Sequence, residues 1–232
     1  MTAVKRRRIY LMRHGSVDYF RSDGSAVPAA TVSLNDAGRA QATAAGELFA
    51  RCGVRFDRVI TSGLKRTLET AHCVLTAGGA ALTPETEPAL EEIRGGRLAD
   101  IPPEQVTAAF LGAFETGSGV ESQRFLGGES VGELLDRVLP AFDRVLARTD
   151  WNTLLMVLHG GVNRALLARA LTGERAYFGR MEQLPACINI IDVGTHDLVL
   201  RAANLAPTQW LHQHESQTTM EKLLAQYLRL DA

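Results

Sequence analysis

Histidines and arginines follow the apolar segments of this sequence, at positions where their side chains could do chemistry. Arg13 and His14 come directly after one apolar run. Arg66 lies shortly after a second run, and His159 ends a third. A histidine held beside a fixed positive charge is a candidate nucleophile. Each residue alone is also consistent with a polar group at the edge of a strand, so the interpretation depends on the joint pattern.

Two arginines near these histidines favour an anionic ligand. Arginine presents a fork of donors that matches phosphate oxygens and keeps its charge at any working pH. Glycines at positions 15, 160 and 161, beside the histidines, let the backbone approach a ligand closely. Helix N-termini would add backbone N–H groups and a positive dipole. The pattern therefore predicts a phosphate-like ligand in preference to a sugar or a carboxylic acid.

A histidine in such a pocket could form a covalent bond to phosphorus. Its neutral imidazole attacks through one ring nitrogen, so a hydrogen bond must hold the proton on the other nitrogen. The leaving alkoxide then needs a proton, which a carboxylic acid can donate. Glu91 and Glu92 follow an extended segment and are candidates for this acid, although both could also be solvated surface groups.

The segments that must position these residues alternate between strand and helix patterns. Strand patterns lie at 8–12, 56–62, 82–88, 152–159, 187–194 and 197–205. Helix patterns lie at 36–52, 63–79, 130–149, 161–173 and about 217–230. Pro140 should bend the third of these helices. The alternation predicts an α/β layer fold with a mostly parallel sheet. Because the carboxyl ends of parallel strands share one edge, the polar residues should meet there.

Length and composition are those of one ordinary globular domain, which we place at 1–232. The 232 residues are 46% hydrophobic and 22% charged, with a formal net charge of -1. This balance favours neither nucleic acid nor an anionic membrane as a partner. The apolar run after the basic residues 5–8 is too short for an export signal, and no stretch approaches the ~20 apolar residues of a membrane span. We therefore expect a cytoplasmic protein.

The cysteines and the remaining histidines give no sign of a metal centre. Three cysteines lie far apart in the sequence, at Cys52, Cys73 and Cys187. Their odd number and wide spacing indicate reduced thiols rather than a disulfide framework. His212 and His214 lie close to Glu215, but a third well-spaced ligand is lacking. These residues therefore predict no metal site at His212 and His214.

An ordered set of motifs resembles the histidine phosphatase superfamily, with its phosphoglycerate mutase-like fold. The motifs are Arg-His-Gly at 13–15, "SLNDAGRAQATAAGELF", "VITSGLKRTLETA", "LEEI", "GGESVGELLDR" and "VLHGG". They follow the family's order over 9–164. The resemblance implies a three-layer αβα sandwich with a small helical cap, and no metal or organic cofactor.

The resemblance also implies a role for each candidate residue. His14 would become phosphorylated, and Arg13 and Arg66 would clamp the phosphoryl group. His159 would contact that group and stabilise the transition state. Glu92 would be the proton donor, with Glu91 as the alternative. Ser16 and Gly160, which follow the two histidines, are further candidates for contact with the substrate.

Departures from the family pattern favour a phosphatase over a mutase. Ser16 and Val17 replace the residues that often follow the Arg-His-Gly motif, and Asp-Tyr-Phe at 18–20 stands where the mutases usually have Trp-Asn. Gly63 replaces a Ser or Pro, and the segment after Glu92 is shorter than in the mutases. We therefore expect hydrolysis of a small-molecule phosphomonoester. A phosphoglycerate mutase-type phosphotransferase and a non-catalytic phosphate-binding protein are the alternatives.

Substrate choice should depend on two segments beyond the motifs. The insert at about 94–127 contains Val106, Phe110 and Phe114 at helical spacing, and this helix either roofs the pocket or packs on the sheet. The loop 18–30 is a candidate second wall. The amphipathic C-terminal segment either packs on its own domain or makes a dimer contact, so a monomer and a homodimer both stay open.

Overall fold

The computed structural model describes the following residues: 6–21, 23–112, 114, 119–213 and 215–228. Among them, six strands form one sheet in the order β3-β2-β4-β1-β5-β6. The strands are β1 (Arg7–Arg13), β2 (Arg58–Thr61), β3 (Glu85–Thr86), β4 (Thr153–Leu158), β5 (Ile188–Val193) and β6 (Leu198–Leu205). The helices are α1 (Asp36–Arg51), α2 (Lys65–Ala77), α3 (Val106–Leu111), α4 (Val131–Ala147), α5 (Gly160–Thr172) and α6 (Thr219–Leu228).

The sheet is mostly parallel, as the sequence predicts. β1, β4, β2 and β3 pair in parallel, whereas β5 pairs antiparallel with both β1 and β6. The β5–β6 hairpin closes through a hydrogen bond from Gly194 N to Asp197 O, at the predicted turn. The crossover helices between the parallel strands place the carboxyl ends of β1, β2 and β4 at one edge.

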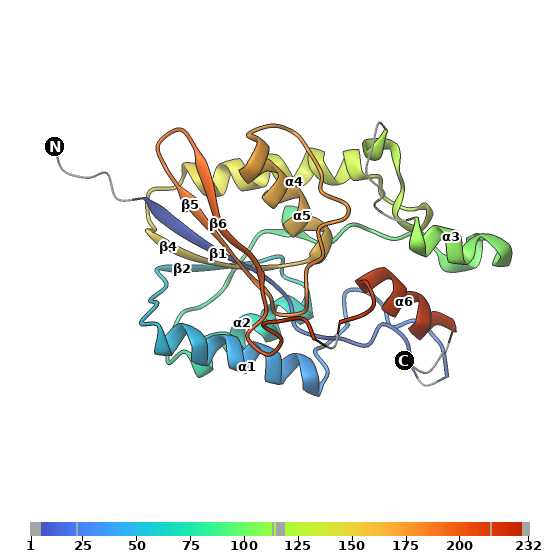
Figure 1. Cartoon of the computed structure of the whole chain (residues 1–232), viewed down its shortest axis with the longest axis horizontal. Helices are drawn as coiled ribbons and strands as arrows, with labels where there is room; N and C mark the ends of the chain where they lie inside the picture. The colour runs from blue at the N-terminus through green and yellow to red at the C-terminus, as the bar shows by residue number, and fades with distance from the viewer. Residues whose placement is uncertain (1–5, 22, 113, 115–118, 214, 229–232) are drawn as a thin grey trace.

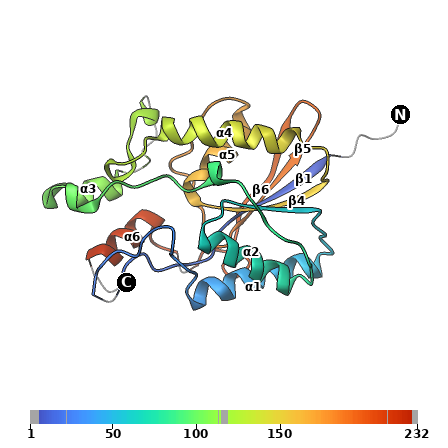
Figure 2. The ribbon, with the colours of Figure 1, turned by 180° about the vertical axis from the view of Figure 1, so that it is seen from behind.

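Helices cover both faces of the sheet and make three layers (Figure 1). α1 and α2 lie on one face, and α4 and α5 lie on the other, as the reverse view in Figure 2 also shows. Ile9 and Leu11 of β1 belong to the core under α4 and α5, while Tyr10 and Met12 belong to the core under α1 and α2. Because both faces are covered, β1 is apolar at consecutive positions rather than alternating.

Capping side chains fix where two of the helices begin. The Asn35 side chain accepts a hydrogen bond from Gly38 N at the start of α1. Ser130 and Glu133 form a reciprocal capping box at the start of α4, which continues through Pro140 to Ala147. α2 begins at Lys65 rather than at the predicted Gly63, since Gly63 has a φ of 90° and cannot belong to a right-handed helix.

The predicted cap insert lies beyond the carboxyl edge of the sheet, next to α6 (Figure 1). The spacing of Val106, Phe110 and Phe114 predicts a helix that includes all three residues, but α3 ends at Leu111. Phe114 lies past that end with a φ of 69°. Short 3-10 turns at 98–100, 103–105, 120–122 and 125–127 complete the described part of the insert, and positions 113 and 115–118 lie outside the described residues.

The C-terminal helix α6 packs against its own domain. Met220 and Leu224 are buried in the same core as Phe110 of α3. Tyr227 stacks on Phe110 with ring centroids 5.7 Å apart. These contacts favour the intrachain alternative for the apolar face of this helix, whose predicted last residues, 229–230, lie outside the described part of the chain.

Candidate active site

The carboxyl ends of three parallel strands bring the two histidines together. His14 N donates to Leu158 O over 3.0 Å, so the end of β1 is bonded to the end of β4. The rings of His14 and His159 lie edge to face, with centroids 5.4 Å apart. Ser62, which follows β2, reaches His159 Nε2 with its Oγ at 2.8 Å. The predicted convergence of the strand ends is therefore present in the structure.

Two glycines let the backbone after His14 lie directly against the start of α1. A Cβ on Gly15 would lie 2.4 Å from Gly38 O, and a Cβ on Gly38 would lie 2.1 Å from Ser16 O. Gly15 N also donates to Thr70 Oγ1 at 3.0 Å. The close approach of these backbones requires glycine at both positions, which explains two of the sequence motifs.

His14 is held with its nucleophilic nitrogen unprotonated. Its Nδ1 lies 2.8 Å from Gly15 O. A carbonyl oxygen only accepts, so Nδ1 carries the proton and Nε2 keeps its lone pair. Burial, together with the positive charges of Arg66 and Arg13, lowers the pKa of His14 well below its usual value. The imidazole is therefore neutral at working pH, as attack on phosphorus requires.

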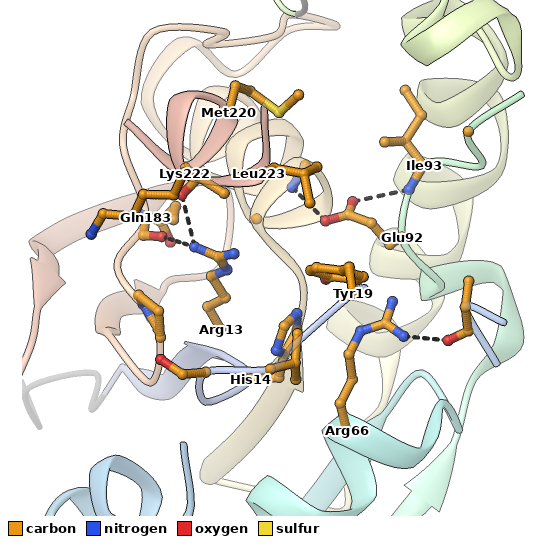
Figure 3. Close-up of a pocket in the computed structure, with 18 of the residues that line it drawn as sticks. Arg13, His14, Tyr19, Arg66, Glu92, Ile93, Gln183, Met220, Lys222 and Leu223 are labelled. Carbon is orange, nitrogen blue, oxygen red and sulfur yellow. Dashed lines mark hydrogen bonds between the residues drawn. The ribbon is translucent and has the colours of Figure 1, made fainter. Parts of the chain in front are cut away.

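Arg13 and Arg66 lie on opposite sides of His14, with Glu92 nearby (Figure 3). Arg13 Nη1 donates to Gln183 O at 2.5 Å and to Thr219 Oγ1 at 3.0 Å. Arg66 Nη1 donates to Ala29 O at 2.7 Å. The Nε atoms of both arginines are buried and have no hydrogen-bond partner among the described residues. Each guanidinium is thus anchored by one nitrogen and keeps donors for an anionic ligand.

His159 lies behind the cavity surface and is completely buried. Thr67 gives its hydroxyl proton to Leu64 O at 2.7 Å, so the 3.1 Å contact between Ser62 and Thr67 has Ser62 as the donor. Ser62 Oγ then accepts from His159 Nε2. His159 Nδ1 has no partner among the described residues. Burial and the charge of Arg66 lower its pKa well below the usual value, and its contact with a phosphoryl group stays a prediction.

Glu92 is placed at the N-terminus of α5. Its Oε2 accepts from Gly161 N at 3.0 Å, and its Oε1 accepts from Ile93 N at 2.9 Å. A Cβ on Gly161 would lie 2.5 Å from Glu92 Oε1, so the second glycine after His159 makes room for this carboxylate. Glu91 also lines the cavity, but its carboxylate lies 3.8 Å from the exposed Arg94. The geometry favours Glu92 over Glu91 as the acid.

Arg137 of α4 holds the Glu92 segment and was not among the candidates from the sequence. Its guanidinium donates to the carbonyl oxygens of Glu91 and Glu92 at 2.6 Å and 3.0 Å. It also pairs with Glu129 at 2.7 Å. Burial opposes the charge of Glu129, but the hydrogen bonds from Arg137 and Arg94 N outweigh it and lower the pKa. Glu129 belongs to the Gly-Glu-Ser motif at 128–130, so this motif is the sequence feature that points to the role of Arg137 in holding the Glu92 segment.

A cavity of about 740 Å³ opens in front of His14. Arg13, Arg66, Glu92, Ser16 and Gly160 all line it, so every candidate except His159 contacts the cavity. The insert lines it through Phe110, Phe114, Phe125 and Leu126, and part of the loop 18–30 forms a second wall. Phe110 is also completely buried in the core, so the insert both packs on the domain and roofs the pocket. Gln183 and several residues of α6 line it as well, without any sequence motif that pointed to them.

No group of three metal-ligating side chains occurs among the described residues. His214, one of the two histidines considered as metal ligands in the sequence, lies outside the described residues. Glu215 forms an ion pair with Lys222. The three cysteines are free thiols. Within the described ranges, no helix is long and apolar enough to cross a membrane.

Comparisons with known proteins give one family. The model of the histidine phosphatase superfamily, branch 1, matches residues 9–206. A glucosyl-3-phosphoglycerate phosphatase of Mycolicibacterium vanbaalenii is 31% identical over 173 residues, with 71% of this chain and 74% of that protein covered. A 2,3-bisphosphoglycerate-dependent phosphoglycerate mutase 2 of Lactiplantibacillus plantarum is 27% identical over 188 residues, with 68% and 81% covered. A solved mycobacterial glucosyl-3-phosphoglycerate phosphatase in complex with VO3 is 25% identical with a TM-score of 0.65, covering 85% of this chain and 98% of that chain.

Proposed function

Because the chain belongs to the histidine phosphatase superfamily, we propose that it hydrolyses small-molecule phosphomonoesters through a phosphohistidine on His14. The observation that carries this proposal is the state of His14. Its Nδ1 proton is committed to Gly15 O, and its ring lies between two arginines that keep donors for a phosphoryl group. A histidine that attacks phosphorus must be neutral, and positive groups must stabilise the charge that spreads over the phosphoryl oxygens.

In the first step, the Nε2 lone pair of His14 attacks phosphorus and the ester P–O bond breaks. Arg13 and Arg66 bind the equatorial oxygens as charge spreads over them. Glu92 gives a proton to the leaving alkoxide, which departs as an alcohol. The products of this step are phosphohistidine, an alcohol and the Glu92 carboxylate.

In the second step, water attacks phosphorus and the N–P bond breaks. The Glu92 carboxylate takes a proton from the attacking water, and the lone pair returns to His14 Nε2. Inorganic phosphate leaves, and the enzyme regains neutral His14, with the proton taken from water on Glu92. His159 donates from Nε2 to Ser62, so it would support the transition state through Nδ1 only once that nitrogen has gained a proton.

We also propose that the reaction uses no metal or organic cofactor, and that the protein acts in the cytoplasm. The chemistry of the preceding steps is complete with side chains and water. Treatment with EDTA should therefore leave the rate unchanged, and a loss of rate restored by a divalent cation would contradict this part of the proposal.

Turnover of p-nitrophenyl phosphate at pH 5–8 tests the hydrolase directly. We expect release of phosphate, competitive inhibition by vanadate, and loss of turnover in His14→Ala with an unchanged thermal melting curve. Mutase activity is tested by adding 3-phosphoglycerate with its bisphosphate. Efficient formation of 2-phosphoglycerate would favour the phosphotransferase alternative. Phosphate binding without turnover of any phosphomonoester would favour a non-catalytic protein.

A further inference from the structure

The cavity is much larger than a phosphoryl group needs. Its volume of about 740 Å³ lies within the range typical of sites that enclose a small organic molecule. Arg13, His14 and Arg66 line one part of the cavity, and the loop after Ser16, the insert and α6 line the rest. The shape of this second part must therefore select the alcohol part of the ester. This inference rests on the proposed hydrolysis of phosphomonoesters.

Apolar side chains from distant parts of the chain build this second part of the cavity. Prominent among them are Val17, Phe20, Ile93, Phe125, Met220 and Leu223. In Figure 3, Met220 and Leu223 lie on the side of the cavity opposite His14. Tyr227 joins the loop to the insert, because its ring centroid lies 5.6 Å from that of Phe20 and 5.7 Å from that of Phe110. The loop, α3 and α6 thus form one continuous wall, which we call the apolar wall.

The cations that line the cavity beyond the clamp are already paired. Arg164 lies 3.5 Å from Glu182, and Lys222 forms an ion pair with Glu215. Arg94 at the rim has a side chain 64% exposed and lies 3.8 Å from Glu91. At Arg164 or Lys222, a second anionic group on the substrate would displace a carboxylate from its partner. The pair of Arg94 is exposed and contributes little.

Polar amides line the cavity too, but two of them serve the local backbone. Gln41 Oε1 accepts from Ser16 N at 3.0 Å, and Gln226 Oε1 accepts from Tyr19 N at 3.4 Å. These bonds hold the loop that carries Val17 and Phe20 in place. These two acceptors are therefore not available to a substrate, while Thr208, Gln209 and Gln217 also line the cavity.

We propose that the preferred substrate is a phosphomonoester of an uncharged, largely apolar alcohol, whose body lies against the apolar wall. Burial of that body provides binding free energy in proportion to its apolar area. The phosphoryl end is recognised by the charged clamp, and the apolar end is recognised by residues outside the catalytic motifs. Esters with a second anionic group, such as phosphoglycerates, should be poor substrates.

A ladder of n-alkyl phosphates tests this proposal without changing the chemistry at phosphorus. Butyl, hexyl and octyl alcohols are leaving groups of nearly equal acidity, so differences in kcat/KM report contacts of the chain. We expect kcat/KM to rise by up to about fourfold for each methylene that the wall buries. A terminal carboxylate, as in 5-carboxypentyl phosphate, should lower kcat/KM at least about tenfold relative to an alkyl phosphate of equal length, because the apolar wall would desolvate it and Arg164 and Lys222 are already paired.

Two leucines of α6 provide matched variants. Leu223 lines the cavity, whereas Leu228 on the same helix is 45% exposed and is not among the lining residues. Leu223→Ser should flatten the dependence on chain length, with turnover of butyl phosphate reduced least. Leu228→Ser should keep the dependence of the parent protein.

The results separate this inference from the proposed function. If all three alkyl phosphates were hydrolysed alike in a His14-dependent reaction, the hydrolase would stand and the apolar-substrate inference would be wrong. Preference for 5-carboxypentyl phosphate or 3-phosphoglycerate over the alkyl esters would also overturn it. If no phosphomonoester were hydrolysed, the proposed function would fail and this inference with it.

Discussion

At the scale of single residues, hydrogen-bond donors and acceptors decide the state of the site. His14 Nδ1 faces a carbonyl oxygen, which fixes the tautomer that leaves Nε2 free to attack. Glu92 is held by two backbone N–H groups, one of them from Gly161 at the start of α5. Helix α5 therefore begins directly after His159, and the N–H of its Gly161 orients Glu92, the proposed proton donor in the reaction at His14.

Substitution of the two glycines after His159 tests how Glu92 is positioned. Gly161→Ala should lower kcat by about tenfold to a hundredfold, because the new Cβ would lie 2.5 Å from Glu92 Oε1 and displace a proton donor. Gly160→Ala is the comparison variant, since its Cβ would meet Arg13 Nε at an ordinary 3.6 Å rather than Glu92; because Gly160 lines the cavity, its loss should appear in KM rather than in kcat. Steady-state kinetics should show a much smaller loss of kcat in this variant. Equal losses in the two variants would mean that Glu92 is not the residue affected.

At the scale of elements, parallel strands bring the motif residues together and α6 completes the clamp. Thr219, the first residue of α6, accepts from Arg13 Nη1 and donates to Glu182. The position of the C-terminal helix is thus coupled to the residue that binds the phosphoryl group.

Thr219→Val removes this coupling while keeping the shape of the side chain. We expect KM for a phosphomonoester to rise about threefold to tenfold, the effect of one lost hydrogen bond on a charged group, with a smaller change in kcat. Thr172→Val is the control, because Thr172 Oγ1 bonds only within the end of α5 and the segment that follows it. If the two variants had the same KM, Thr219 would have no part in holding Arg13.

Short-range patterns predicted the elements and the motif residues well. The apolar run before Arg13, the cap at Asn35 and the capping box at Ser130 each act locally, so the sequence alone reveals them. The sequence did not predict Gln183, Thr219 or the aromatic contacts of Tyr227. These contacts join residues far apart in the chain and depend on how the insert and α6 pack, which periodicity does not determine.

At the scale of the whole molecule, burial of the two histidines couples stability to pH. Burial, aided by the arginines, lowers the pKa of both His14 and His159 in the folded protein well below the unfolded value. Below pH of about 6.5 the unfolded chain binds protons that the folded protein does not, so folding loses free energy as the pH falls. Above that pH both states hold neutral histidines, and this contribution to stability is complete.

Urea unfolding at several pH values measures this effect. The free energy of unfolding should decrease between pH 7 and pH 5, by up to about 1.4 kcal/mol per pH unit for each buried histidine. A His159→Gln variant should show a shallower decrease than the parent protein. A free energy of unfolding that stays constant over this range would contradict the buried neutral state of the two histidines.

The oligomeric state can be tested by removing α6. The buried face of α6, with Met220 and Leu224, is already covered by its own domain. A chain that ends after Pro207 should therefore have the same oligomeric state as the full chain. Size-exclusion chromatography with light scattering measures this. A change from dimer to monomer on truncation would show instead that the C-terminal segment makes the dimer contact.

Transfer of a phosphoryl group to His14 is the central claim, and trapping it is the most direct test. Brief mixing with a labelled phosphomonoester and quenching in alkali should leave one acid-labile phosphate on the protein. Mass spectrometry should place this phosphate on His14, and a folded His14→Ala protein should take up none. Equal acid-labile labelling of the variant, or a label on another residue, would contradict the account.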